Sequence, residues 1–331
     1  MKRTLILTTI LVFGSLSLTH AQNKKGKSTE AWRKESAAKY KGNPTDEHKT
    51  IIDAAIPTPE AKPKSERKVL VFHRCEGFIH TSIPFGNYAM ESIAKNTDAF
   101  SADLADEYDV FTKENLAQYD AIIFNSTTNL IPNESQRAAI LDFINRGKGI
   151  VGFHAAADNF KDWEEGIALI GGVFTGHPWT AGGTWAFKLE DPKHTLNEAF
   201  DGNGFWHKDE IYWYKPENFE GRDRLRVLMS LDMSRPENQK PLENERHQKN
   251  LGETAKAEVD VPVSWLKEVG KGRLFFTNLG HNDMTYANNR VLQHMLDGIQ
   301  YAMGDIEADA TPSSQVNVET VHAPETAPTK N

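Results

Sequence analysis

The sequence predicts an α/β protein with a mostly parallel central sheet, helices on both faces of the sheet, and additional antiparallel strands in the C-terminal half. Between residues 68 and 154, short apolar runs alternate with helical segments, and helices of about 10–15 residues between strands are typical of βαβ units. After residue 163, several extended-looking runs follow one another. We expect some of them to extend the sheet and others to form an antiparallel lobe.

The elements of the first half follow in order. Residues 68–73 form a β-branched, apolar run, and residues 84–96 read as a helix with a proline near its start, where proline is tolerated. A short extended piece at 109–111 precedes an apolar strand at 120–125. The lengths and boundaries of these runs are those expected of strands and helices in a parallel α/β sheet.

The clearest helix spans residues 132–146. Pro132 lies in its first turn, Ala138, Leu141 and Ile144 fall near one face, and Gly147 ends it. An apolar strand of residues 149–153 follows and delivers His154 at its carboxyl end.

The second half is expected to contain five extended runs and a final helix at 288–303. A charged stretch at 236–259 reads as an inserted loop. The extended runs span residues 184–190, 210–214, 226–232, 261–267 and 273–278.

The chain of 331 residues divides into four expected parts. Residues 1–21 have the positive start, apolar middle and small residues near Ala21 of a secretory signal peptide, which predicts a periplasmic or secreted protein. Residues 22–66 are expected to form a linker or N-terminal extension, 67–304 the α/β domain and 305–331 a disordered tail. No later segment approaches the roughly 18 apolar residues of a membrane helix, so membrane insertion is not expected.

Charge and cysteine content exclude several classes of protein. The formal net charge of −8 becomes −10 once Lys2 and Arg3 leave with the signal peptide, and an acidic surface disfavours nucleic acid or anionic membrane as a partner. Cys75 is the single cysteine, so an internal disulfide is excluded and stability must come from an ordinary core.

His154 is the expected centre of a functional site, because ligands of open α/β sheets bind at the carboxyl ends of the strands. His177 and His281 also follow strand-like runs, and the three loops should converge on one crevice. Residues 147–152 match G-x-G-x-x-G but enter a strand from a helix, the reverse of a dinucleotide site. A serine or cysteine nucleophile is absent from position 154, which disfavours covalent acyl chemistry.

The chemistry expected of this site is proton transfer or metal binding. Imidazoles near a carboxylate suit both, and zinc, nickel or iron are the metals they favour. We expect catalytic roles for His154, His177, His281, Asp209 and Glu210, with the three histidines as candidate ligands of a divalent transition metal such as zinc. Substrate contacts are assigned to His80, Asp158, Trp163, Trp179 and Tyr212. Four further histidines, His207, His247, His294 and His322, are expected to be solvated.

The chain resembles the ThuA-like, or trehalose-utilisation, family. The matching motifs run from residues 68–72 and 77–83 through 111–116, 136–138, 149–158, 171–174 and 176–178 to 209–212, 262–265 and 270–281, with Trp163 between them. The sequence departs from the family pattern at residues 74–76 and 127–130. The resemblance therefore covers residues 68 to about 303.

This resemblance implies a flavodoxin-like, class I glutamine amidotransferase-like fold, a three-layer sandwich. His154 occupies the place of the cysteine nucleophile of those amidotransferases, so glutaminase activity is not expected. The family context implies carbohydrate metabolism, with a 3-keto-sugar or glycoside as substrate and a sugar oxidoreductase as a functional partner.

Three functions remain open on the sequence. The leading hypothesis is an exported carbohydrate-processing enzyme, a hydrolase, lyase or isomerase, in which His154 is the base. A non-catalytic carbohydrate-binding module and a metal-dependent hydrolase are the alternatives. The sugar, the bond attacked, the metal and the oligomeric state are left open.

Overall fold

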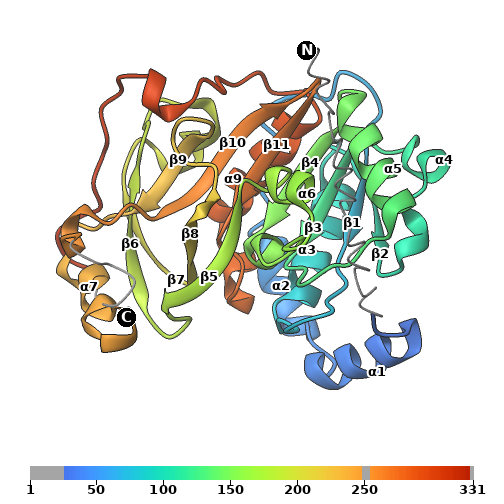
Figure 1. Cartoon of the computed structure of the whole chain (residues 1–331), viewed down its shortest axis with the longest axis horizontal. Helices are drawn as coiled ribbons and strands as arrows, with labels where there is room; N and C mark the ends of the chain where they lie inside the picture. Colours follow the sequence, from blue (N-terminus) through green and yellow to red (C-terminus); the bar gives the residue numbers. More distant parts are fainter. Residues whose placement is uncertain (1–25, 248–253, 329–331) are drawn as a thin grey trace, which may run out of the picture.

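The computed structural model describes residues 26–247 and 254–328, so the expected signal peptide lies outside the described residues. It is an α/β protein around a nine-stranded mixed sheet with the strand order β2-β1-β3-β4-β11-β10-β9-β6-β7 (Figure 1). The pairs β2–β1, β1–β3, β3–β4 and β4–β11 are parallel. The pairs from β11 to β7 are antiparallel. The predicted fold class, with parallel strands first and antiparallel strands in the C-terminal half, is confirmed.

The parallel part is built from short strands, of which all but the edge strand β2 are apolar and largely buried. The apolar runs predicted at residues 68–73, 120–125 and 149–153 form strands close to those positions. The strands are β2 (Ser101–Ala105), β1 (Lys68–Phe72), β3 (Ala121–Asn125), β4 (Gly149–Phe153) and β11 (Gly272–Thr277). Of these, β3 and β4 are buried at every position, as expected for central parallel strands.

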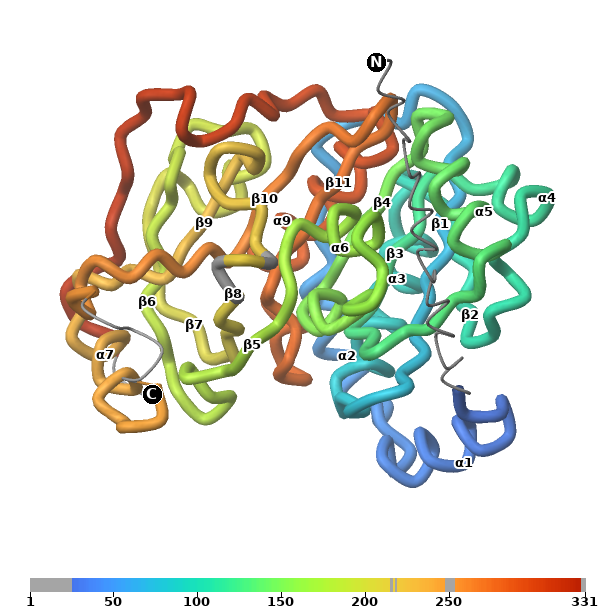
Figure 2. The backbone as a smooth tube through the Cα atoms, viewed as in Figure 1, coloured from blue at the N-terminus to red at the C-terminus, as the bar shows by residue number. Residues whose placement is uncertain are grey.

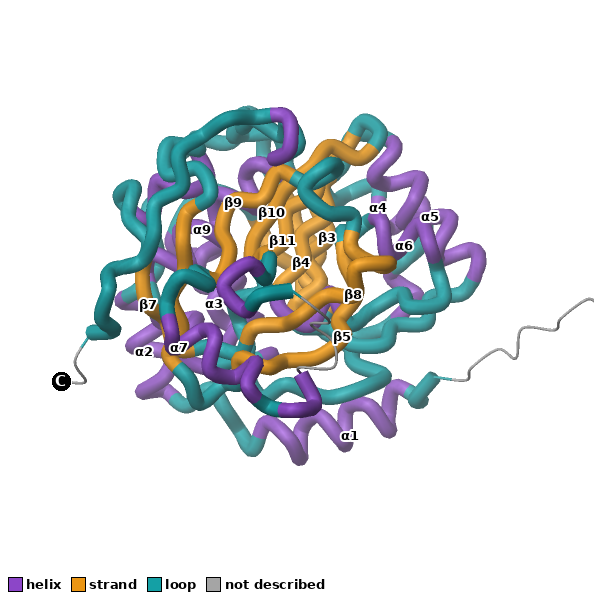
Figure 3. The backbone as a smooth tube through the Cα atoms, turned by 60° about the vertical axis from the view of Figure 1, so that its left-hand side comes forward, coloured by secondary structure: helices purple, strands orange, loops and turns teal. Residues whose placement is uncertain are grey.

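The antiparallel part completes the sheet and adds a separate two-stranded sheet. Its sheet strands are β10 (Pro262–Val269), β9 (Arg226–Leu231), β6 (Thr184–Leu189) and β7 (Phe205–Lys208). The separate pair is β5 (Gly172–Trp179) with β8 (Ile211–Phe219), and Figure 3 shows it beside the large sheet, close to α7 (Pro236–Gln239). The segment at 236–259, expected to be a loop, thus contains a short helix, and residues 248–253 lie outside the described residues.

Helices cover both faces of the sheet and enclose two apolar cores. One face carries α3 (Ile83–Asn96) and α9 (Asn289–Ala302), and the other carries α4 (Lys113–Leu116), α5 (Glu134–Asn145) and α6 (Glu164–Ala168). Alternate residues of one strand reach the two cores, since Ile123 packs with the α3–α9 side and Ile122 with the α5 side. This alternation follows from the two-residue period of a strand.

The structure differs from the predicted elements in three places. The edge strand β2 lies at Ser101–Ala105, whereas residues 109–111, expected to be extended, overlap a 3-10 turn at Tyr108–Val110. Helix α5 buries Ala139, Ile140, Phe143 and Ile144. Of the residues predicted to share a face, Ile144 is buried, Leu141 packs partly buried against the core, and Ala138 is exposed. Strands β5 and β7 were not predicted as strands.

The N-terminal extension is folded against the domain. It contains α1 (Thr29–Tyr40) and α2 (Asp46–Ala54). Trp32 of α1 is buried and donates a hydrogen bond from Nε1 to Asp106 Oδ2 (3.1 Å), and Arg33 pairs with the same carboxylate. The helix α2 begins with a capping box between Thr45 and His48, which satisfies free backbone N–H groups of its first turn.

The C-terminal segment, residues 305–328, was expected to be disordered. In the structure it follows an extended path along the outer side of β6 (Figure 2). Leu189 and Val321 exchange two backbone hydrogen bonds of 3.0 and 2.9 Å, and Ala323 is buried with its N–H on Asp232 Oδ2. Backbone pairing rather than an apolar pattern holds this segment, which is why its composition gives no signal.

Candidate functional site

His154 lies at the carboxyl end of β4, where the strand passes into a 3-10 turn (His154–Ala157). Its φ of +43° is in the left-handed region, which is rare for a residue with a side chain and is found where surrounding structure imposes it. The side chain is fully buried. A strained turn at a strand end therefore fixes the direction of this imidazole.

The neighbouring strand β11 determines which ring nitrogen of His154 carries hydrogen. Phe153 is paired with Thr277 in the parallel register, so Asn278 lies beside His154. The His154 Nδ1–H donates to the Asn278 carbonyl (2.9 Å), which leaves the Nε2 lone pair free. Burial lowers the pKa of His154 well below its ordinary value, so the ring is neutral.

His281 follows β11 on a loop that Asp209 holds in place. The Asp209 carboxylate accepts hydrogen bonds from the backbone N–H groups of Gly280 (2.8 Å) and Asn282 (2.9 Å) and from Thr285 Oγ1 (3.0 Å). Asp209 is fully buried, and burial raises the pKa of its carboxyl. It thus positions the loop and offers no atom to solvent.

Glu210 connects the buried and exposed parts of the site. Its Oε1 lies 3.2 Å from His281 Nδ1 and 3.8 Å from His154 Nε2, and its Oε2 lies 3.2 Å from His177 Nδ1. Burial lowers the pKa of His281, but the hydrogen bond and charge of Glu210 outweigh this and raise the pKa overall. The His177 side chain, on β5, is 50% exposed, so it forms the solvent side of the network.

His80 comes from the loop after β1 and completes the buried part. Its ring centre is 4.8 Å from that of His154 and 5.0 Å from that of His281. Its Nε2 lies 3.4 Å from the Tyr212 hydroxyl, and burial lowers the pKa of His80 to about 3. Within the described part of the chain, its buried Nδ1 has no hydrogen-bond partner.

Four side chains meet at one point and could hold a metal ion. One donor atom each from His80, His154, Glu210 and His281 lies within 4.8 Å of the other three. We call these four residues the histidine–glutamate centre. Of the three histidines predicted as ligands, His154 and His281 belong to it, whereas His177 lies outside it and contacts Glu210.

Three predicted substrate contacts lie elsewhere. Trp179 is fully buried and its Nε1 donates to the Asn238 carbonyl, so it presents no face to a ligand. Trp163 is buried against Phe160, and Asp158 pairs with Lys161 at 2.6 Å. Tyr212 does lie at the centre, with its ring 4.4 Å from that of His154.

Several residues of the site were missed, and the sequence held a signal for one of them. Asn278 is the last residue of the predicted strand 273–278, so the rule that placed His154 at a strand's carboxyl end would also have placed Asn278 there. Phe78 is 58% exposed and its ring centre lies 4.8 Å from that of His80, and Phe174 stacks on His177. Nothing in the pattern around these two rings distinguishes them from core phenylalanines.

Two other predictions concern residues outside the centre. Cys75 is buried and burial raises the pKa of its thiol to about 12, which makes it a poor nucleophile; covalent acyl chemistry was disfavoured on the sequence. His294 was expected to be solvated and is fully buried, with Nε2 2.7 Å from Ser264 Oγ and Nδ1 2.6 Å from the Leu196 carbonyl.

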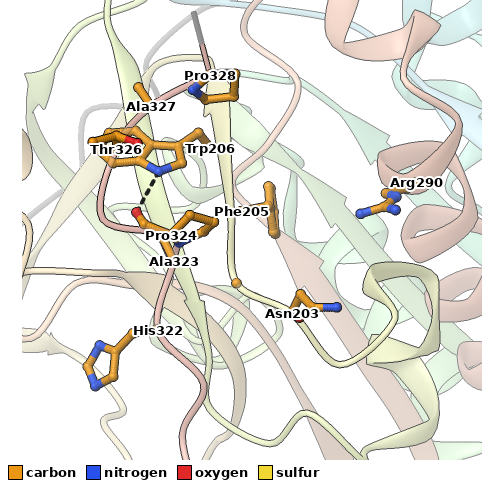
Figure 4. A pocket seen from close by; sticks show the side chains of 11 residues that line it. Asn203, Phe205, Trp206, Arg290, His322, Ala323, Pro324, Thr326, Ala327 and Pro328 are labelled. Atoms are coloured by element: carbon orange, nitrogen blue, oxygen red, sulfur yellow. Dashed lines mark hydrogen bonds between the residues drawn. The ribbon is translucent and has the colours of Figure 1, made fainter.

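A separate hollow lies under the C-terminal segment (Figure 4). Trp206 donates from Nε1 to the Pro324 carbonyl (2.9 Å) across it. Its lining contains no residue of the histidine–glutamate centre, so the two features are independent. None of the helices in the described ranges is long and apolar enough to cross a membrane.

Comparisons with known proteins agree on one family. A family model named ThuA and described as trehalose utilisation matches residues 68–302. A ThuA-like protein from Parabacteroides merdae is similar in structure, with a TM-score of 0.54 and 17% identity over 76% of this chain and 96% of its own. A ThuA-like protein from Bacteroides uniformis has a TM-score of 0.52 and 22% identity, over 73% of this chain and 94% of its own. No curated protein sequence matches significantly.

Proposed function

This chain belongs to the ThuA family, described as trehalose utilisation, and on that premise we propose that it is an exported carbohydrate-processing enzyme that acts on a keto-sugar or keto-glycoside. The observation that carries the proposal is the Glu210 bridge. One oxygen of its carboxylate faces the buried histidines and the other faces half-exposed His177. Glu210 thereby connects His177, which can carry a proton at the surface, to the buried histidines.

The roles within the site follow from burial and tautomer. His154 was the expected base, but it is buried and its pKa is lowered, which makes it a poor proton acceptor. His177 suits that role, because Glu210 accepts from its Nδ1–H and leaves the Nε2 lone pair toward solvent. We assign the role of base to His177 Nε2. We assign polarisation of the substrate carbonyl to the buried histidines.

The chemistry is elimination next to a ketone. A keto group acidifies the neighbouring C–H, and the proton passes from that carbon to His177 Nε2. The glycosidic C–O bond then breaks, and the leaving oxygen takes up a proton to depart as an alcohol. Addition of water to the resulting enone would complete hydrolysis. The ketone itself must come from an oxidoreductase that acts on the parent sugar.

Phe78 supplies the sugar contact that the buried tryptophans do not. Its exposed ring lies beside His80, and Lys39 of α1 sits 5.1 Å from its centre. An apolar ring face of this kind can stack on a sugar ring.

The test is incubation of the mature chain with a panel of glycosides and their 3-keto derivatives, read by mass spectrometry. We expect keto derivatives to be consumed and parent glycosides to remain. His177→Ala should lower kcat by about 10²–10⁴-fold, the usual contribution of a positioned acid or base, with little change in KM.

His322→Ala is the matched control. His322 is 52% exposed and pairs with a carboxylate, Asp232, at 3.0 Å, as His177 does with Glu210, but it lies at the C-terminal segment. Full activity of His177→Ala would remove the assignment of the base. Binding of glycosides with no product from any member of the panel would favour the carbohydrate-binding module instead.

A further inference from the structure

We propose that the histidine–glutamate centre binds one divalent transition-metal ion of the zinc class, through the three imidazoles and Glu210. Metal binding requires only these four residues. Its part in catalysis, as a Lewis acid on the substrate carbonyl, rests on the proposed function.

The spacing of the donor atoms fits a single ion. Metal–ligand bonds of about 2.0–2.1 Å at tetrahedral angles place donors about 3.3 Å apart. His154 Nε2 and His281 Nδ1 are 3.1 Å apart, His281 Nδ1 and Glu210 Oε1 are 3.2 Å apart, and His154 Nε2 and Glu210 Oε1 are 3.8 Å apart. These three atoms form a triangle close to one face of such a tetrahedron, and His80 offers the fourth ligand.

Hydrogen bonds alone leave this centre with too few protons. His281 Nδ1 carries at most one hydrogen, yet that atom faces two acceptors, His154 Nε2 and Glu210 Oε1. The buried His80 Nδ1 has no partner among the described residues. Buried polar atoms are almost always satisfied, and a cation would satisfy the facing lone pairs of His154, His281 and Glu210 together, with His80 close enough to offer a nitrogen to the same ion.

The surroundings resemble those of known metal ligands in their hydrogen bonding. A ligand histidine usually donates its second N–H to a carbonyl or carboxylate, which fixes the ring. His154 does so to the Asn278 carbonyl (2.9 Å). The free Glu210 oxygen is held by His177 Nδ1 (3.2 Å), and Asp209 anchors the loop of His281 through Gly280 and Asn282.

The donor set selects the class of metal. Three imidazoles with one carboxylate suit zinc, iron, nickel or cobalt, whereas calcium and magnesium prefer oxygen ligands. The single thiol of the chain, Cys75, is buried and is not among the four donors. A bound divalent ion would polarise a ketone oxygen and stabilise negative charge on it as the neighbouring proton leaves.

The experiment measures metal directly, on tag-free mature protein. Elemental analysis by mass spectrometry should find about one zinc-class ion per chain, as expected of a site with four protein ligands. Chelator treatment should remove it. Titration of the stripped protein with Co²⁺ should then give the visible absorption of a four- or five-coordinate site.

Matched variants separate ligands from their neighbour. His80→Gln and His281→Gln should weaken Co²⁺ binding by more than about 100-fold, since loss of an outer-shell partner alone costs 10–100-fold. His177→Ala removes only an outer-shell partner of Glu210 and should weaken Co²⁺ binding by no more than about 10–100-fold, whereas His322→Ala should bind metal as the unchanged protein does. Circular dichroism and thermal unfolding of the stripped proteins check that each variant is folded.

The outcomes distinguish this inference from the proposed function. Absence of bound metal and of Co²⁺ binding in folded protein, or unchanged binding by both glutamine variants, overturns the metal site. Turnover of keto-glycosides by the stripped protein would overturn the catalytic role of the metal and leave the proposed function standing. Stoichiometric metal without any turnover of keto-glycosides would support the metal site and contradict the proposed function.

Discussion

Asp297 is a buried carboxyl on α9, outside the histidine–glutamate centre. Its side chain is fully buried, Gln293 Nε2 donates to its Oδ1 (2.7 Å), and burial raises its pKa to about 8. In the folded state it therefore keeps its proton in a range where an unfolded aspartate, with a pKa of about 3.9, has lost it.

The consequence is a stability that falls as pH rises. Between about pH 4 and pH 8 the native state binds the proton and the unfolded state does not, so the free energy of unfolding decreases with increasing pH. Asp297→Asn should remove this dependence and raise Tm more at pH 8 than at pH 5. Thermal unfolding of metal-free protein at pH 5 and pH 8 measures this difference in Tm. Asp46→Asn, at an exposed aspartate, is the control. An equal Tm difference at the two pH values would contradict the assignment.

Buried histidines show what a sequence can and cannot reveal about single residues. His294 and His154 are both fully buried. Both nitrogens of His294 are hydrogen-bonded, by Ser264 and Leu196, so it is structural. The position of His154 at a strand end was readable from the apolar run before it. His80 was expected to contact substrate, but its place among the donor atoms of the centre was not readable. Its loop packs on the residues that follow β3, where Thr128 Oγ1 donates to the Phe78 carbonyl, and such a path depends on the tertiary fold.

Close packing of α9 on the sheet depends on a glycine. A Cβ at Gly298 would come within 2.2 Å of the Phe275 ring on β11. Gly298→Ala should lower the free energy of unfolding by about 1–3 kcal/mol, the usual effect of overpacking, even though alanine favours helix.

Denaturant unfolding measures this change. Gly182→Ala is the control, since no atom lies within 4 Å of its added Cβ. Equal stability of the Gly298 variant and the unchanged protein would show that the helix shifts at no cost.

At the level of elements, the sequence predicted the central strands better than the edge strands. β3 and β4 are buried at every position and therefore appear as continuous apolar runs. The edge strand β2 has no fully buried residue, and β5 pairs with β8 through register shifts and contains exposed residues. Such strands take their conformation from pairing with neighbours, which no local apolar pattern records.

The C-terminal segment joins distant parts of the whole molecule. Ser313 donates its backbone N–H to the Leu225 carbonyl (3.0 Å), and Val321 pairs with Leu189. Deletion of residues 312–331 should therefore lower Tm by about 6–12 °C, taking about 1 kcal/mol per lost hydrogen bond for these three bonds and about 2–4 °C per kcal/mol.

Thermal unfolding by circular dichroism tests this, and Ala323→Pro should reproduce part of the loss by removing the N–H that Asp232 accepts. An unchanged Tm of the shortened chain would mean that these contacts add nothing to the stability of the fold.

The parallel pairing of β4 with β11 separates two tasks in this molecule. Neighbouring strands lie about 4.8 Å apart, so the spacing of His154 and Asn278 is set by hydrogen bonds of the central sheet, which open only when the domain unfolds globally. Phe78 is exposed and stands instead on a loop outside the sheet. Changes in that loop can therefore alter which molecule binds while His154 and Asn278 keep their spacing, and a library for the proposed substrates should be built there.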